Sequence, residues 1–161
     1  MKTLPLLIAA NLLAVASNAQ SLTATLSGAN ERPTPNASLA TGVASVSITG
    51  DLLSYSVSYS GFNPTAGHIH GPAGVDANAG VMVPFTLTSS SGNSGLFSGT
   101  ATITATQKSD ILAGLSYANL HSAAFPGGEV RGQLVVIPEP GTYALIALGA
   151  SVLALRARRK P

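Results

Sequence analysis

Strict alternation of apolar and hydroxyl-bearing residues recurs along the middle of this 161-residue chain. Between residues 53 and 59 it places Leu, Tyr, Val and Tyr on one side and three serines on the other. The segments 22–26, 44–48 and 97–106 repeat the pattern with smaller residues. Because successive side chains of a strand point to opposite faces, each segment predicts a half-buried strand with a hydroxyl-rich outer face.

The remaining patterns extend this to an all-β fold. Gly50-Asp51 separates two alternating segments and predicts a tight hairpin turn. Further short strands are predicted at residues 67–70, 81–87, 117–122 and 129–136. We therefore expect residues 20–137 to form an antiparallel Greek-key β-sandwich or barrel of about eight strands.

The alternation also indicates which side chains face the core. The large residues of the longest strands should be buried, namely Tyr55, Val57, Phe97 and Ile103. One short helix is predicted at residues 110–113, with Ser109 as its N-cap and Gly114 at its end.

The N-terminus has the three parts of a secretory signal peptide. Lys2 precedes an apolar stretch at residues 4–15, and the small residues 16–19 follow it. We expect cleavage after Ala19, so that residues 1–19 are absent from the exported protein. The apolar stretch is short for a membrane anchor, which is the alternative interpretation.

The C-terminus, residues 138–161, predicts a sorting tail. Pro138-Glu139-Pro140 ends the last strand, because proline cannot donate to a ladder. An uncharged run at residues 142–155 then predicts a short transmembrane helix, and the basic residues at 156–160 place its far end in the cytoplasm. Everything before this helix is expected outside.

The charge distribution argues against a nucleic-acid partner. The chain carries a net charge of +2, but its basic residues gather at the two ends. Residues 20–137 hold fewer basic than acidic side chains, the basic ones being Arg32, Lys108 and Arg131. A weakly acidic domain is a poor phosphate binder. The chain has no cysteine, which excludes disulfides and thiolate metal sites.

Three histidines are the most chemically distinctive residues. His68 and His70 are separated by one residue, so on a strand both side chains project from one face. Such a pair is a half-site for zinc or copper, and His121 on another strand could complete a three-nitrogen site. We expect the three to form one cluster.

The alternative for this cluster is structural. The imidazoles would then bond to Asn119, Glu129 or backbone carbonyls and hold a polar corner of the fold. Under the metal interpretation, Asn119, Glu129 and Arg131 are candidates for supporting the ligands from behind. Glu129 and Arg131, two residues apart on one strand, could instead form a surface ion pair.

Several motifs resemble those of the CHRD domain, first described in chordin. The matching segments are residues 28–33, 42–44, 53–62, 66–73, 117–122 and 126–134. They include both histidine motifs, Ala66-Gly67-His68-Ile69-His70-Gly71-Pro72 and Tyr117-Ala118-Asn119-Leu120-His121-Ser122. The resemblance assigns a CHRD domain to residues 20–137 and implies an extracellular location.

The tail resembles the PEP-CTERM sorting signal of Gram-negative bacteria. The order Pro138-Glu139-Pro140, apolar helix and basic end carries this resemblance. It implies recognition by an exosortase in the membrane, cleavage near the proline motif, and release to the cell surface or an extracellular polymer matrix.

Two functions are compatible with these observations. The first is an exported binding or structural module, not an enzyme, whose partner is an unidentified extracellular molecule or matrix polymer. The second is a small copper or zinc protein that binds the metal through His68, His70 and His121 and that could be redox-active. Its histidine-bearing strand is similar at fold level to copper/zinc superoxide dismutase. That pattern needs four copper histidines and a disulfide, so dismutation is disfavoured.

Overall fold

The computed structural model describes residues 19–138. The expected signal peptide, apart from its last residue Ala19, and the expected C-terminal helix and basic end lie outside the described residues. Within the described range, none of the helices combines the length and apolar character needed to span a bilayer.

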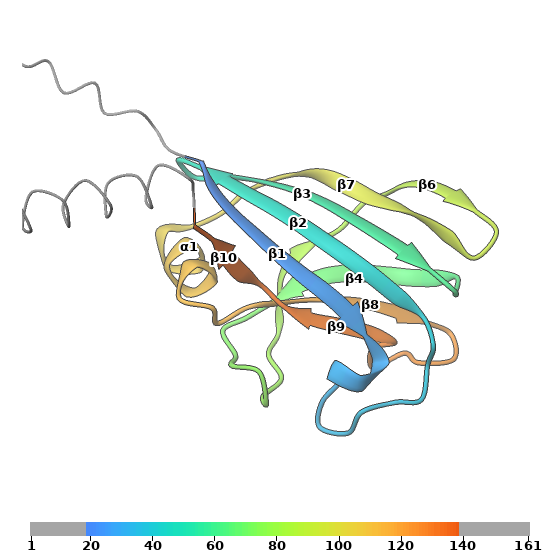
Figure 1. Ribbon diagram of the computed structural model, residues 1–161. Coiled ribbons are helices and arrows are strands. Elements are labelled where there is room, and N and C mark those ends of the chain that lie inside the picture. Colours follow the sequence, from blue (N-terminus) through green and yellow to red (C-terminus); the bar gives the residue numbers. More distant parts are fainter. Residues whose placement is uncertain (1–18, 139–161) are drawn as a thin grey trace, which may run out of the picture.

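The described chain forms one continuous antiparallel sheet of ten strands (Figure 1). The order across the sheet is β5-β4-β8-β9-β1-β2-β3-β7-β6, with β10 also paired to β1. The strands are β1 (Gln20–Ser27), β2 (Thr41–Thr49), β3 (Leu52–Ser60), β4 (Pro64–His70), β5 (Val81–Pro84), β6 (Leu87–Ser91), β7 (Ser94–Thr102), β8 (Tyr117–Ser122), β9 (Val130–Gln133) and β10 (Val135–Ile137). The predicted antiparallel all-β fold is confirmed, with more strands than expected.

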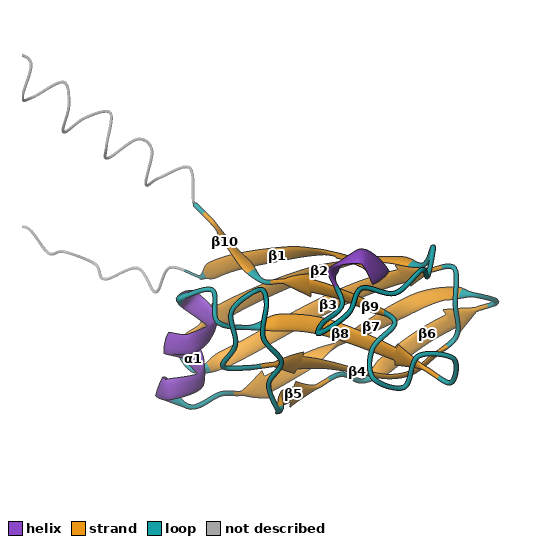
Figure 2. Ribbon diagram, turned by 90° about the horizontal axis from the view of Figure 1, so that it is seen from below, coloured by secondary structure: helices purple, strands orange, loops and turns teal. Residues whose placement is uncertain are grey.

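The sheet curls so that its two halves face each other across one core. Strands β1, β2, β3 and β7 form one layer, and β4, β8 and β9 lie opposite them (Figure 2). Apolar residues from both halves meet in this core, including Leu26 and Val57 on one side and Ile69 and Leu120 on the other. Curling lets a single sheet bury one face and expose the other.

The expected core positions are confirmed. Tyr55, Val57, Phe97 and Ile103 are all nearly inaccessible to solvent, Val57 completely so. The hairpin at Gly50-Asp51 is also confirmed, since Thr49 pairs with Leu52 across it. Gly50 has a φ of 60°, a conformation that favours glycine.

The helix begins earlier than the sequence alone predicted. Helix α1 (Ala105–Leu112) starts at Ala105, so the strand before it ends at Thr102 and does not reach residue 106. Its N-cap is Thr104, not Ser109, because Thr104 and Gln107 form a reciprocal capping box. The capping box favours a helix here, although apolar and hydroxyl-bearing residues still alternate up to residue 106. Gly114, with a φ of 75°, ends the helix as expected.

The two outer faces of the curled sheet differ in what covers them. The outer face of β1, β2, β3 and β7 carries hydroxyl-bearing side chains, none of them buried. The outer face of β4, β8 and β9 is covered by loops from residues 31–40, 71–80 and 123–129, as their hydrogen bonds to Asn119, Arg131 and His121 show. A second, polar interior lies beneath these loops and contains the histidines.

Candidate metal centre

The three histidines come from two neighbouring strands. His68 and His70 project from β4, and His121 projects from β8. The register pairs His70 with Tyr117 and His68 with Asn119. His121 lies two residues beyond Asn119 on β8, on the same face. His70 and His121 therefore occupy opposite ends of this stretch of the strand pair, and His68 lies between them.

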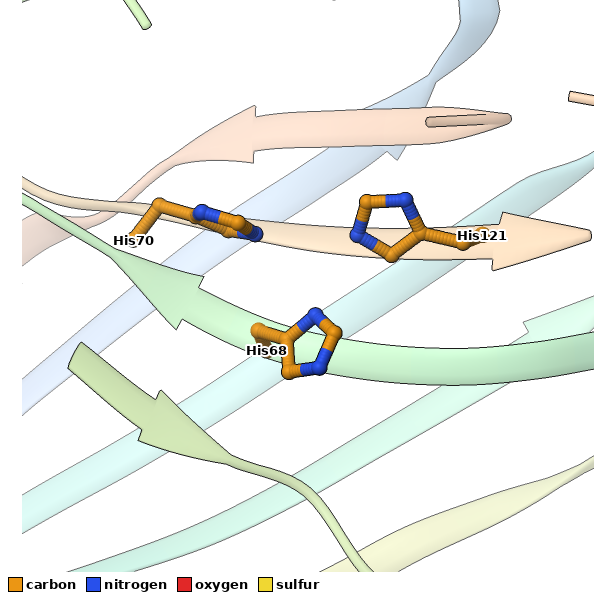
Figure 3. A group of neighbouring side chains, drawn as sticks. All are labelled: His68, His70 and His121. Carbon is orange, nitrogen blue, oxygen red and sulfur yellow. The ribbon is translucent and has the colours of Figure 1, made fainter. Parts of the chain in front are cut away.

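The imidazole rings form a compact triangle (Figure 3). Their centroids are 5.3 Å apart for His68 and His70, 5.1 Å for His68 and His121, and 5.8 Å for His70 and His121. One ligand nitrogen from each residue lies within 4.8 Å of the other two. The predicted clustering of the three histidines is therefore confirmed.

Backbone carbonyls hold two of the rings from behind. The Nδ1 atom of His70 lies 3.0 Å from the carbonyl oxygen of Ala79, and that of His121 lies 3.1 Å from the carbonyl oxygen of Pro126. A carbonyl can only accept, so Nδ1 carries the proton in both rings and Nε2 keeps its lone pair. Metal-binding histidines are oriented in this way in many proteins.

Three of the four remaining ring nitrogens are buried and have no partner among the described residues. They are Nδ1 of His68, Nε2 of His70 and Nε2 of His121. Buried polar atoms are almost always satisfied, and three lone pairs gathered in one triangle form a donor set that a metal ion would suit. Zinc–nitrogen bonds of about 2.0–2.1 Å in a tetrahedral site put nitrogens roughly 3.3 Å apart. A bound ion would therefore draw the three nitrogens closer together than they lie here.

Burial keeps these rings neutral. It is the largest cause that lowers the pKa of each histidine below its ordinary value of 6.5. The neighbouring imidazoles lower the pKa of His68 further, while the bond to Ala79 partly offsets the shift in His70. Neutral imidazole is the form that coordinates a metal ion.

A stack of three side chains supports His70. The ring of His70 lies parallel to that of Tyr117, with an interplanar angle of 6° and centroids 5.0 Å apart. The guanidinium of Arg131 covers the Tyr117 ring, 3.5 Å from its centroid. Tyr117 Oη also accepts a hydrogen bond from the backbone N–H of Ala79, the residue whose carbonyl holds His70.

Arg131 organises the loop that carries Ala79. It is 1% exposed, and its guanidinium donates to the Asn78 side chain at 2.6 Å and to the Ala77 carbonyl at 2.7 Å. Longer bonds reach the carbonyls of Gly74 and Val75. Loop 74–79 is therefore wrapped around one buried charge next to the histidines.

The three candidate supporting residues occupy different positions. Arg131 reaches His70 through Tyr117. Asn119 lies on the histidine face, but its side chain donates to Glu31. Glu129 accepts from Ser38 at 2.7 Å and forms no ion pair with Arg131 in the described part of the chain. The partners of Arg131 could not be predicted from the pattern around it, because they lie more than fifty positions away in the chain.

Sequence reasoning missed Glu31 as part of this interior. Glu31 is 4% exposed, and its Oε1 atom has no hydrogen-bond partner among the described residues. Burial raises the pKa of Glu31 from 4.5 to about 7, while Arg131, Asn119 and Arg32 lower it by smaller amounts. Nothing in the local pattern around residue 31 indicates burial, because loops from elsewhere in the chain cover it.

Replacing Glu31 by glutamine should change how stability depends on pH. The folded protein keeps the Glu31 proton up to about pH 7, whereas the unfolded chain releases it near pH 4.5. The stability from this group is therefore present below pH 4.5 and is lost as the pH rises toward 7, by about 3 kcal/mol in all. We expect urea unfolding at pH 5 and pH 8 to show about 2–3 kcal/mol more loss in the wild type than in Glu31→Gln. Equal losses would contradict the assignment, since both proteins share every other titrating group.

Comparison with known proteins gives two family matches. The model of the CHRD domain matches residues 22–134, and that of the PEP-CTERM protein-sorting motif matches residues 136–160. No curated protein and no solved structure matches the chain. The sorting motif marks an exported protein that is processed by an exosortase.

The domain match includes all three histidines, Tyr117 and Arg131, and it covers the described strands from the third residue of β1 to the end of β9. The two models together cover nearly all of the sequence beyond the expected signal peptide. The chain therefore belongs to the CHRD domain family.

Proposed function

We propose that the exported domain is a binding module, not an enzyme, and that it binds one divalent transition-metal ion through His68, His70 and His121. The carrying observation is the triangle of orphaned, buried nitrogens described above. Three neutral imidazoles suit Zn²⁺ and Cu²⁺, and the Irving–Williams order favours Cu²⁺ at equal availability. The site would act at the cell surface or outside the cell, after transient anchoring through the C-terminal tail.

The preorganisation of the site supports this proposal. The carbonyls of Ala79 and Pro126 fix two tautomers, and the Arg131–Tyr117 stack fixes the plane of His70. A purely structural cluster would use its ring nitrogens in hydrogen bonds on both sides. Here only the outer nitrogens of His70 and His121 have such partners among residues 19–138.

Calorimetric titration of the chain, purified without a histidine tag, tests the proposal. We expect one Cu²⁺ or Zn²⁺ ion to bind with micromolar or tighter affinity. His70→Ala should weaken binding at least about 100-fold, because two imidazoles remain, and His68→Ala and His121→Ala should act alike. Asp76→Asn is the matched control, since this carboxylate is 84% exposed and lies outside the triangle.

Equal weak binding in the wild type and all three alanine variants would refute the metal site and leave the histidines as structural polar residues. Near-ultraviolet circular dichroism shows whether each variant is folded. If one variant fails to fold, the other two still show whether the histidines bind the metal ion.

A further inference from the structure

The outer face of β1, β2, β3 and β7 is covered almost entirely by hydroxyl groups. Outward positions on these strands alternate with the buried ones, and all but Val43, Leu52 and Leu96 are serine or threonine. We call this surface the hydroxyl face. Its members are Ser21, Thr23, Thr25, Ser27, Thr41, Ser45, Ser47, Thr49, Ser54, Ser56, Ser58, Ser60, Ser94, Ser98, Thr100 and Thr102.

The hydroxyls are aligned in rows across the strands. Thr23 pairs with Ser45, Ser45 with Ser56, and Ser56 with Ser98. A neighbouring row joins Ser21, Ser47, Ser54 and Thr100. Strand geometry spaces such groups about 4.8 Å apart across the sheet and about 6.7 Å apart along it. The face is therefore a regular lattice of groups that both donate and accept hydrogen bonds.

Most of these hydroxyls are not used inside the protein. Among residues 19–138, the structure gives side-chain hydrogen bonds only to Thr23, Ser94 and Ser98 of the hydroxyl face. The others are free to bond to water or to a ligand. A solvent-facing sheet of ordinary composition carries lysine and glutamate, so a face without any charge calls for an explanation.

Two shallow grooves lie on this face, one after the other along the strands. The first, of about 330 Å³, is lined by Ser21, Ser45, Ser47, Ser54, Ser56 and Ile137, among others. The second, also of about 330 Å³, is lined by Thr25, Thr41, Val43, Ser58 and Ser60, among others. Because β3 contributes Ser56 to one groove and Ser58 to the other, an extended chain could occupy both.

The chemistry of the face selects the class of partner. It offers no cations for phosphates or for an acidic membrane surface. It lacks the exposed aromatic, methionine and arginine side chains that form the centre of protein interfaces. What it offers is an uncharged array of hydroxyls, which complements a ligand of the same kind. We propose that the hydroxyl face binds a neutral polysaccharide chain along its two grooves.

The expected strength follows from the type of contact. Each protein–sugar hydrogen bond replaces bonds to water, so its net contribution is small and a single sugar unit binds weakly. A repeating polymer presents many equivalent segments and several domains can bind it at once, so retention rises through multivalency. Binding should therefore be clear on a polymer matrix and weak for a monosaccharide.

Retention on polysaccharide beads tests the proposal with the purified chain. We expect retention on cross-linked dextran or agarose beads. Ser56→Asp and Ser58→Asp, one in each groove, should each lower retention at least about fivefold, because each replaces a hydroxyl donor with a larger, strongly hydrated group that cannot donate and that fills the groove. Ser109→Asp, an exposed hydroxyl on α1, and His70→Ala should both retain the wild-type level, which separates this site from the metal centre.

Three results would overturn the proposal. The first is a lack of retention on either neutral matrix, and the second is equal retention of all variants. The third is concentration-dependent dimerisation in sedimentation velocity that Ser56→Asp abolishes, which would assign the face to a second copy of the chain. Thermal unfolding confirms that each variant is folded before it is compared.

Discussion

Val57→Asp should lower the free energy of unfolding by about 3–5 kcal/mol, because it places an unpaired carboxylate in the core between the two halves of the sheet. Val57 is completely buried, and its neighbours across the sheet are Ala44 and Phe97. None of these can donate a hydrogen bond through its side chain. A domain of this size has about 5–15 kcal/mol of stability in total, so the loss is readily measured.

The adjacent residue provides the control for this prediction. Ser56 points out of the same strand into solvent, so Ser56→Asp should cost less than about 1 kcal/mol. Urea unfolding followed by circular dichroism gives both values. If the two substitutions cost the same, the inner and outer faces of β3 have been assigned wrongly.

Arg131→Met should have the second large effect, on both stability and metal affinity. The substitution keeps an apolar stem but removes the four hydrogen bonds that Arg131 donates to loop 74–79. Hydrogen bonds from a charged donor contribute about 1.5–3 kcal/mol each, and the short ones to Asn78 and Ala77 are both lost. With the lost contact over Tyr117, we expect the unfolding free energy to fall by about 3–5 kcal/mol.

The same variant should weaken metal binding about 10–100-fold, since residues that orient a ligand typically matter to this extent. Ala79, whose carbonyl oxygen bonds to the His70 ring, is the last residue of the loop that Arg131 fixes. Arg32→Met is the matched control. Arg32 also contacts this loop, through Asp76 at 3.2 Å, but at the surface, so its loss should cost less than about 1 kcal/mol and leave affinity unchanged. Unaltered metal affinity in folded Arg131→Met would contradict the positioning role.

The strands could be predicted from sequence because their signal is local. Alternation at residues 53–59 identifies both the strand and its buried face, and Gly50-Asp51 identifies the turn before it. The start of α1 was misplaced because Thr104 and Gln107 form a capping box inside a segment that still alternates. Strand β6 was not predicted, because its five residues are all exposed and show no alternation of apolar and polar side chains.

The candidate site could be predicted only in part. The spacing of His68 and His70 fixes their common face, whatever the fold. Their approach to His121 depends on the register of β4 with β8, which joins residues about fifty positions apart. The roles of Arg131 and Glu31 depend on loops that fold over the sheet from distant parts of the chain, and no local pattern carries that information.

X-ray absorption spectroscopy of the copper- or zinc-loaded chain determines whether the three histidines hold the metal ion. We expect about three imidazole nitrogens at roughly 2.0–2.1 Å from the metal, with one further light ligand. Replacing His121 by alanine should remove one imidazole from this shell or abolish loading. A shell of oxygen ligands alone, or an imidazole signal that survives replacement of each histidine in turn, would contradict it.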